Sequence, residues 1–256
     1  MNKIRFISFT ASLVLAITFI LSCEDKEAKN KPAEAAAPPI EAEKTPSAEA
    51  PAPKEGTFTD PRDGKKYKFV RIGEQVWMAE NLNFAVKGSK CYGEDDEVVI
   101  GYDEEMPIPI TKTLSETEVQ ANCDKYGRLY DWETALKTCP SGWHLPSKAE
   151  WEVLDKAVGG EKVAGKKLKA TSGWISDDGE NKPINGTDEF GFSALPGGNG
   201  DSDGRFYYVG SSGSWRSATE ENVNHDVYCW NIYSNGNAGG LYSGKSGLLS
   251  IRCVQD

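Results

Sequence analysis

Apolar and polar residues are patterned most clearly in the segment that follows Ser147. Three apolar side chains recur there at helical spacing and share one face: Trp151, Leu154 and Val158. The Ser147 side chain can accept a hydrogen bond from the first turn. Glu150, three residues on, can accept one from the Ser147 N–H, which makes a capping box. Gly159 and Gly160 tolerate the left-handed backbone that ends many helices. The pattern therefore predicts an amphipathic helix between Ser147 and Gly159.

Shorter patterns predict the remaining elements. Residues 67–72 and 75–78 favour a hairpin around Gly73-Glu74. Residues 127–136 predict a short helix that packs through Leu129, Trp132 and Leu136. After Trp174 the chain is rich in Gly, Asn, Ser and aromatic residues, and brief strands are expected at 206–209, 227–233 and 248–254. Few helices and many short strands indicate an α+β domain whose second half is rich in loops.

The first 22 residues have the layout of a secretory signal. Lys3 and Arg5 precede an almost uncharged apolar run at 6–21, which Ser22 and Cys23 close. This ending resembles a bacterial lipobox, in which the cysteine is lipidated, for instance with palmitate, and becomes the mature N-terminus. An ordinary signal peptide, or an uncleaved anchor with an incidental cysteine, is the alternative. We expect a lipoprotein signal peptide at 1–22, lipidation of Cys23, and a lipid bilayer as the partner of that anchor.

Residues 23–56 are expected to be a linker. They hold six prolines among Ala, Glu and Lys, and no aromatic residue. Such a stretch cannot bury enough apolar area to offset its ordering entropy, and its prolines stiffen it. The acidic residues 24–27 resemble sorting signals that carry some lipoproteins to the cell surface. We therefore expect an outer-membrane lipid-anchored protein, facing the periplasm or the cell surface, with its folded domain at 57–256.

The folded domain is acidic. The formal net charge of the chain is −10, and nearly all of it falls in residues 57–256. Nucleic-acid phosphates require clustered Lys and Arg, so this charge argues against a nucleic-acid partner. Beyond the N-terminal run, the sequence has no apolar stretch long enough to span a membrane.

Five cysteines remain once Cys23 is assigned to the anchor: Cys91, Cys123, Cys139, Cys229 and Cys253. An exported domain meets an oxidising compartment, so disulfides are expected, and the odd number leaves at least one thiol over. Metal binding is the alternative. No two of these cysteines are spaced by two to four residues, and His144 and His225 lie far apart in sequence, so a structural zinc site is disfavoured.

Several short motifs follow one another along residues 57–256. They are Gly64-Lys65-Lys66-Tyr67, 77–82 (WMAENL), 126–130 (YGRLY), 139–147 (CPSGWHLPS), 190–198 (FGFSALPGG), 213–220 (GSWRSATE) and 250–254 (SIRCV). Together they resemble the Fibrobacter succinogenes major paralogous domain. The resemblance implies exported, often lipid-anchored bacterial proteins without an established activity. It also implies a fold similar to the C-type-lectin-like and formylglycine-generating-enzyme (sulfatase-modifying-factor) superfamily, with a small twisted sheet, two or three short helices and a long loop-rich second half.

The resemblance to the lectin-like fold also implies two disulfides. Cys139 and Cys253 would join the helical region to the C-terminus, and Cys91 and Cys123 would close an acidic loop. Closing a loop of about 30 residues stabilises a fold by roughly 3 to 4 kcal/mol in the loop-entropy model. Cys229 would then be the spare thiol, and we expect it to be buried.

The resemblance to formylglycine-generating enzymes would be the ground for an enzymatic function. Those enzymes are oxidases that use a cysteine pair as copper ligands. No such pair can be matched here residue by residue. The one analogue would be Cys229 with Cys253, and the resemblance already implies a disulfide for Cys253. The two scattered histidines suggest no Ser/His/Asp or Cys/His arrangement. We therefore expect a non-catalytic protein without a cofactor, with an oxidoreductase of this type as an alternative.

Calcium is the one metal that the sequence favours at all. Asn199, Asp201 and Asp203 alternate as oxygen donors, and Gly204 occupies the sixth position, as in the start of a calcium loop. The twelfth position is Gly210, where a calcium loop needs a bidentate Glu. An acidic turn without a metal is the simpler interpretation.

Aromatic residues gather in the loop-rich half and are the candidate ligand-binding residues: Tyr207, Tyr208, Trp215, Trp230, Tyr233 and Tyr242. Aromatic faces offer a large apolar contact with a polar handle, which suits sugars and protein partners alike. The alternative is that these side chains fill the core. We expect a domain that binds a glycan or an envelope protein through loops between residues 177 and 247. A structural or adhesive envelope protein without a small ligand is the alternative function.

Overall fold

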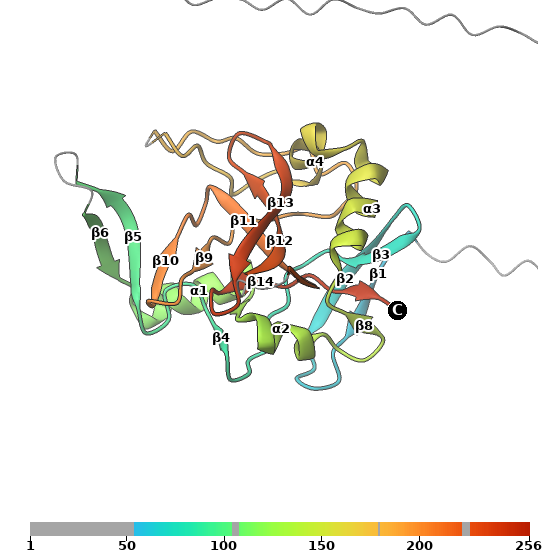
Figure 1. Cartoon of the computed structure of the whole chain (residues 1–256), viewed down its shortest axis with the longest axis horizontal. Coiled ribbons are helices and arrows are strands. Elements are labelled where there is room, and N and C mark those ends of the chain that lie inside the picture. Colours follow the sequence, from blue (N-terminus) through green and yellow to red (C-terminus); the bar gives the residue numbers. More distant parts are fainter. Residues whose placement is uncertain (1–53, 104–107, 179, 222–225) are drawn as a thin grey trace, which may run out of the picture. The chain divides into compact units, whose positions relative to one another are not determined.

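The computed structural model describes residues 54–103, 108–178, 180–221 and 226–256. The expected signal peptide, Cys23 and nearly all of the expected linker lie outside these residues, as does His225. From residue 54 on, the described residues form one compact unit with four helices and three sheets (Figure 1). The architecture is α+β, as the sequence predicts. Its first strand begins at Glu55, two residues before the expected start of the domain.

Three sheets organise the unit. The first contains, in spatial order, β1 (Glu55–Thr59), β2 (Lys66–Ile72), β3 (Gln75–Met78), β15 (Val254–Gln255) and β8 (Trp143–His144). The second contains β6 (Pro109–Thr113), β5 (Glu97–Tyr102), β10 (Arg205–Tyr207) and β9 (Asn199–Gly200). The third contains β13 (Ala238–Gly244), β12 (Asp226–Tyr233), β11 (Ser212–Glu220), β14 (Leu249–Ser250), β7 (Leu129–Tyr130) and β4 (Ser89–Lys90).

The predicted amphipathic helix is α3 (Lys148–Val158). The Ser147 side chain accepts from the Glu150 backbone N–H, and the Glu150 side chain accepts from the Ser147 N–H, so the capping box is present. Gly159 adopts the left-handed conformation at the C-terminus, with a φ of 106°. The start, the end and the buried face of this helix are therefore confirmed.

The short helix predicted at 127–136 begins later than expected. It is α2 (Trp132–Thr138), and Asp131 caps it by accepting from the Thr134 N–H at 2.8 Å. Leu129 precedes it in strand β7, which pairs with both β14 and β4, so tertiary pairing overrides the local helical pattern. Leu136 is 39% exposed and does not pack into the core, contrary to the prediction.

Two further helices were not anticipated. Helix α1 (Glu116–Tyr126) has its own capping box at Ser115 and Glu118 but buries only Cys123 and Tyr126, so its apolar pattern is weak. Helix α4 (Glu161–Leu168) contains Gly165, a residue that disfavours helix interiors. A Cβ at that position would lie 2.1 Å from the Gly236 carbonyl oxygen, so the glycine permits close packing of α4 on the chain that leads into β13.

The predicted strands are present, with two corrections. The strand expected at 206–209 is β10, which ends at Tyr207 because Tyr208 adopts a left-handed backbone with a φ of 62°. The hairpin at 67–78 is confirmed by β2 and β3, and the strand at 227–233 by β12. The segment 248–254 is not one strand. It contributes β14 to the third sheet and β15 to the first, because the chain passes between the two sheets at residues 251–253.

The main core is built from aromatic side chains between α3 and the third sheet. Trp151 of α3 lies on Trp230, with ring centroids 4.9 Å apart, and Trp77 of β3 packs on the other side at 4.6 Å. Trp215 of β11 pairs across the strands with Trp230, and neither side chain is exposed. Such a cluster buries a large apolar area for few residues, which stabilises the unit strongly.

Both expected disulfides are formed. Cys139 and Cys253 join α2 to the C-terminal segment with a Cα–Cα distance of 6.0 Å. Cys91, which directly follows β4, is joined to Cys123 of α1 with a Cα–Cα distance of 5.0 Å. Cys229 is a free, buried thiol on β12. The disulfides close sequence separations of 114 and 32 residues and therefore constrain the unfolded chain to different degrees.

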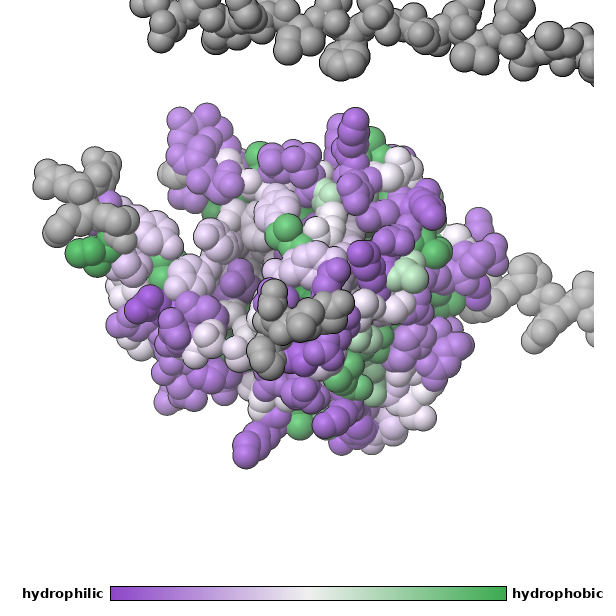
Figure 2. Space-filling model, viewed as in Figure 1, coloured by the Kyte–Doolittle hydropathy of each residue, from purple (hydrophilic) through white to green (hydrophobic). Residues whose placement is uncertain are grey.

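On the face shown in Figure 2 most of the coloured side chains are polar, and the apolar ones form small separate groups. The β5–β6 hairpin extends away from the rest of the unit (Figure 1) and carries exposed apolar side chains, namely Ile100, Tyr102, Ile108 and Ile110. Of the helices in the described residues, none combines the length and the apolar character that a membrane crossing requires.

Candidate ligand-binding pocket

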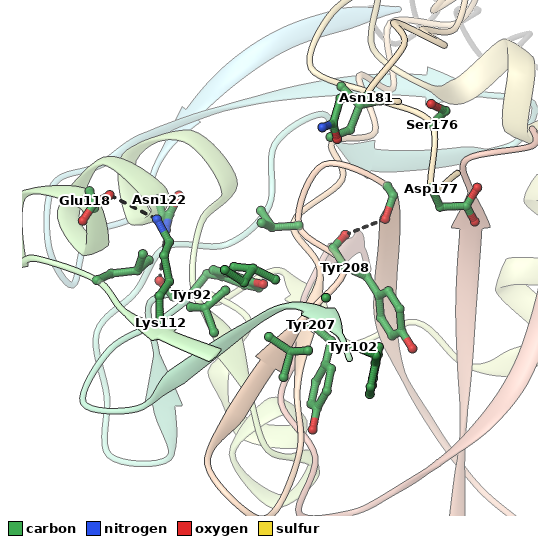
Figure 3. A pocket seen from close by; sticks show the side chains of 18 of the residues that line it. Tyr92, Tyr102, Lys112, Glu118, Asn122, Ser176, Asp177, Asn181, Tyr207 and Tyr208 are labelled. Carbon is green, nitrogen blue, oxygen red and sulfur yellow. Dashed lines mark hydrogen bonds and ion pairs between the residues drawn. The ribbon is translucent and has the colours of Figure 1, made fainter. Parts of the chain in front are cut away.

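A half-open cavity of about 600 Å³ lies where the β5–β6 hairpin, α1, β10 and residues 175–181 meet (Figure 3). Four tyrosines line it, and we call it the tyrosine pocket: Tyr92, Tyr102, Tyr207 and Tyr208. Its volume falls in the range of pockets that hold small ligands in other proteins.

Strand β10 and the turn after it place Tyr207 and Tyr208 at the pocket. Phe206 is buried against Tyr92, with ring centroids 5.2 Å apart. Because side chains alternate along a strand, Tyr207 points to the opposite face from Phe206. The Tyr207 hydroxyl donates to the Asp201 carboxylate at 2.8 Å, which fixes its ring beside that of Tyr208, at a centroid distance of 5.8 Å.

Tyr208 has an unusual backbone for a large residue. Its φ is 62°, in the left-handed region that costs non-glycine residues conformational energy. Its carbonyl oxygen accepts from the backbone N–H groups of Ser211 and Ser212 at 3.1 and 3.0 Å and from the Ser211 hydroxyl at 3.3 Å. These three hydrogen bonds hold the turn that leaves the Tyr208 side chain 55% exposed. A strained, outward-facing aromatic residue is a feature of binding sites.

Tyr102 comes from the hairpin on another side of the same pocket. It is the last residue of β5 and is 53% exposed, so its ring is as available to a ligand as that of Tyr208. Figure 3 shows the side chains of Tyr102, Tyr207 and Tyr208 gathered at one end of the pocket. Since β5 pairs in parallel with β10, the sheet itself brings these tyrosines together.

Polar groups line the remaining walls. On α1, Glu118 lies 3.5 Å from the Lys112 amine, and the Asn122 amide donates to the Tyr92 carbonyl at 3.1 Å. The segment opposite contributes Ser176, Asp177 and Asn181. The pocket therefore combines exposed aromatic faces with amide, hydroxyl and carboxylate groups.

The hydroxyl of Tyr92 is buried in this wall. Burial raises the pKa of Tyr92 far above its ordinary value, so the group stays protonated at neutral pH. The backbone of Val209 lies close to it, but none of the described residues meets hydrogen-bond geometry with it. A buried hydroxyl without a hydrogen-bond partner costs folding free energy, and this oxygen is not accessible from the pocket.

The six aromatic residues singled out from the sequence do not form one surface. Tyr207 and Tyr208 lie together in the tyrosine pocket, and Tyr233 is half-buried at the end of β12. Tyr242 is 46% exposed on β13, where its ring packs against Tyr228 at 5.9 Å. Tyr242 is absent from the residues that line the tyrosine pocket.

The prediction that Trp215 and Trp230 bind a ligand is wrong. Both side chains are fully buried between β11, β12 and α3, because these strands lie in the interior of the third sheet and Trp151 covers them. Neither tryptophan can touch a ligand without unfolding the core.

A family model described as the Fibrobacter succinogenes major domain matches residues 70–255. The chain belongs to this family. No curated protein and no solved structure matches the chain. Within the Fibrobacter succinogenes major domain, the matched segment contains both disulfides, all four pocket tyrosines and the capped helix α3.

The residues proposed for calcium form a turn in this domain. Asn199 lies in strand β9, and Asp201 Oδ1 accepts from the backbone N–H groups of Asp203 and Arg205 at 2.9 and 3.0 Å. Asp201 Oδ2 accepts from Tyr207. In the part of the chain that the structure describes, no group of three or more His, Cys, Asp or Glu residues is placed to hold a metal ion. Calcium binding stays a prediction, and Asp201 has a structural role at the pocket.

The residues considered for catalysis lie apart from the pocket. The Cys229 thiol is buried, which raises its pKa, and Asn231 donates to its sulfur at 3.5 Å. Cys253, its imagined partner, is in a disulfide. His144 contacts Glu150 through Nε2 at 2.6 Å and Asp256 through Nδ1 at 2.7 Å, an arrangement that fixes the C-terminus to α3.

Several pocket residues were not foreseen from the sequence. Tyr102 belongs to the β5–β6 hairpin. The alternation of apolar and polar residues at 98–102 and 108–112 could have predicted these two strands. Asn122 lies on a helix with little apolar periodicity, and Asn181 lies in a loop. Neither carries a local signature, because only the tertiary fold brings them to the pocket.

Proposed function

We propose that this protein is a non-catalytic exported lipoprotein whose domain binds a saccharide in the tyrosine pocket. One observation carries the proposal: exposed Tyr102 and Tyr208 share a cavity with the amide and carboxylate groups of Asn122, Asn181 and Asp177. Sugars present apolar C–H faces and a ring of hydroxyl groups, so they need these two kinds of contact together. Aromatic rings supply the first, and fixed polar side chains supply the second.

The position at the cell envelope rests on the sequence. The apolar run at 6–21 and Cys23 favour a lipid anchor in the outer membrane, and the proline-rich segment would tether the domain. The two disulfides support export, because such bonds persist in oxidising compartments. A lectin-like fold is part of the same proposal. It is supported by small sheets, short helices and a disulfide that ties the C-terminal segment to the helical region.

A protein contact is the second candidate function. The exposed Ile100, Ile108 and Ile110 on the projecting hairpin favour it, since clustered apolar residues on a surface often mark an interaction site. This structural or adhesive role needs no small ligand.

A printed array of neutral and acidic oligosaccharides would test saccharide binding. The purified protein should bind a subset of the array, and the Tyr102→Ala/Tyr208→Ala double variant should lose that subset. Tyr242→Ala is the matched control, because Tyr242 is an exposed tyrosine outside the pocket. A bound oligosaccharide should keep its mass after prolonged incubation, and cleavage or oxidation would contradict the non-catalytic role. An array without any bound saccharide would favour the protein contact.

A further inference from the structure

A second cavity, of about 340 Å³, is bordered by the start of β2, the segment after β3 and the end of α1. Four lysines line it, and we call it the lysine pocket: Lys65, Lys66, Lys68 and Lys125. This concentration of positive charge is unexpected in a chain whose formal net charge is −10.

The two acidic residues that line the lysine pocket form no ion pair with these amines, and Lys65 pairs with Asp63 at 3.6 Å. Only Glu80 and Asp124 line it with negative charge. The Glu80 carboxylate accepts from the Lys68 backbone N–H at 2.7 Å, and the Asp124 carboxylate accepts from Gln120 at 2.9 Å. Within the described residues, no carboxylate lies within ion-pair distance of the side-chain amines of Lys66, Lys68 or Lys125. The ammonium groups of Lys66 and Lys68 are therefore available to an anion, and that of Lys125 lies over the Tyr126 ring, 4.7 Å from its centroid.

A fifth cation lies behind the wall of the pocket. Arg252 is fully buried, and its guanidinium donates to the Asn81 side-chain oxygen at 3.0 and 3.2 Å and to the Ser193 carbonyl at 3.3 Å. Asn81 and Ser193 both line the pocket. Burial lowers the pKa of Arg252 to about 9, so it still carries its charge at neutral pH. Among the described residues no carboxylate lies within ion-pair distance of it. Asp188 and Glu80 lie close enough to favour its charged form, so they offset part of the positive field that Arg252 adds to that of the lysines.

The C-terminal end of α1 would oppose an anion, because the last carbonyl groups of a helix carry partial negative charge. Here those groups are occupied. The Asn81 amide donates to the Tyr126 carbonyl at 2.9 Å, and the Asn83 amide donates to the Cys123 carbonyl at 2.9 Å. This helix end therefore repels an anion less than a helix end with unbonded carbonyl groups would.

Tyr67 is a neutral residue of the lining. The Tyr67 hydroxyl accepts from the Asn83 backbone N–H at 3.1 Å, and in the described residues it donates to no acceptor. Its side chain is buried, which raises the pKa of Tyr67 to about 12 and keeps the proton in place. Because side chains alternate along a strand, its ring lies on the opposite face of β2 from Lys66 and Lys68, in the cluster with Phe58, so the anion would rely on the lysines.

We propose that the lysine pocket binds the carboxylate or phosphate group of a ligand the size of a monosaccharide. The lysines and the Arg252 charge attract the oxyanion, and the cavity has room for one small ring. This site is distinct from the tyrosine pocket, since the two cavities have no lining residue in common. The proposal does not depend on saccharide binding in the tyrosine pocket.

Titration of the purified protein, followed by backbone amide chemical shifts, tests this proposal. The probes are D-glucuronate, D-glucose 6-phosphate, D-glucose and inorganic phosphate. The two charged sugars should shift the amides of Gly127 and Ser193 saturably, and glucose should not. Inorganic phosphate should shift the same amides and compete with both sugars. Raising the ionic strength from 50 to 500 mM, values chosen to span strong screening, should weaken binding to the unmodified protein.

Two double variants separate the site from the overall charge. Lys66→Gln/Lys68→Gln removes two exposed amines at the pocket. It should lower the affinity for both charged sugars about tenfold, a loss of about 1.4 kcal/mol in binding free energy. Lys137→Gln/Lys162→Gln removes the same charge from exposed positions elsewhere and should change nothing. Tyr208→Ala should also leave this binding intact. Equal binding of glucose, equal weakening by both double variants, or no saturable shift with any probe would each overturn the proposal.

Discussion

The indole of Trp151 lies flat on that of Trp230, with ring planes 7° apart and centroids at 4.9 Å. This contact joins α3 to the middle of the third sheet, and neither side chain is exposed. Trp215 and Trp230 of the loop-rich half therefore belong to the core, whereas Tyr208 is exposed.

Replacing Trp151 with alanine should be among the most damaging single substitutions. We expect Trp151→Ala to lower the free energy of unfolding by about 3 to 5 kcal/mol, because it opens a large cavity in the core. Val153, on the same helix, is 42% exposed, so Val153→Ala should cost less than about 0.5 kcal/mol. Urea unfolding followed by circular dichroism measures both. A loss below about 1 kcal/mol for Trp151→Ala would contradict this packing.

The two disulfides should differ in their contribution. Their sequence separations are 114 and 32, and the loop-entropy model assigns about 1 kcal/mol more to the longer loop. The Cys139→Ser/Cys253→Ser variant should therefore unfold at lower urea concentration than Cys91→Ser/Cys123→Ser. The reverse order would show that local packing, and not loop length, sets their effect.

Asp155 should destabilise the protein at neutral pH. Burial raises the pKa of its carboxyl to about 6, and Trp230 donates to its Oδ2 at 3.1 Å. When the folded pKa of a carboxyl is higher than its unfolded pKa, the protein loses stability as the pH rises from the unfolded pKa to the folded one. For Asp155 this window runs from about 4 to about 6. Asp155→Asn keeps an acceptor for Trp230 and should raise the free energy of unfolding by about 2 kcal/mol at pH 8, with little change at pH 3.5. Equal effects at both pH values would contradict the burial of a charge.

His144 should make stability fall at alkaline pH. Burial opposes its charged form, but its hydrogen bonds to Glu150 and Asp256 outweigh this and raise the pKa of the imidazole above 6.5. The stabilisation is therefore complete below the unfolded pKa and is lost as the pH rises through the higher folded pKa. Burial also opposes the charged form of Glu150, but hydrogen bonds from Ser147 and His144 outweigh it and lower the pKa of the Glu150 carboxyl. The stability that Glu150 contributes is therefore lost as the pH falls through this lowered pKa.

Urea unfolding at pH 5.5 and pH 8 tests the histidine directly. His144→Gln should reduce the loss of stability between these values, and the Asp155 contribution should be the same in both proteins. An unchanged loss in the variant would contradict a raised folded pKa of His144, because no stability would then depend on its protonation.

Local signals in the sequence were sufficient for much of the fold. The capping box at Ser147, the hairpin at Gly73 and the α+β class follow from side-chain chemistry within a few residues, and each is confirmed. Leu129 shows where local reasoning ends. Its segment has a helical pattern, yet pairing with β14 and β4 makes it a strand.

The candidate site was predictable only in part. Tyr207 and Tyr208 were found because aromatic residues are frequent in binding loops, but the same rule also selected Trp215, which is buried. Composition cannot distinguish the two, because burial depends on which strand lies in the middle of the sheet. Arg252 and the lysine pocket were missed for the same reason: residues 65–68, 125 and 252 meet only in the folded chain.

Calorimetric titration of Tyr208→Ala with the best-bound saccharide of the array tests the central claim most directly. We expect the dissociation constant to rise about tenfold or more, because the variant removes an exposed aromatic face without disturbing the core. Tyr242→Ala should bind as the unmodified protein does. Unchanged affinity in Tyr208→Ala, or an equal loss in Tyr242→Ala, would contradict saccharide binding in the tyrosine pocket.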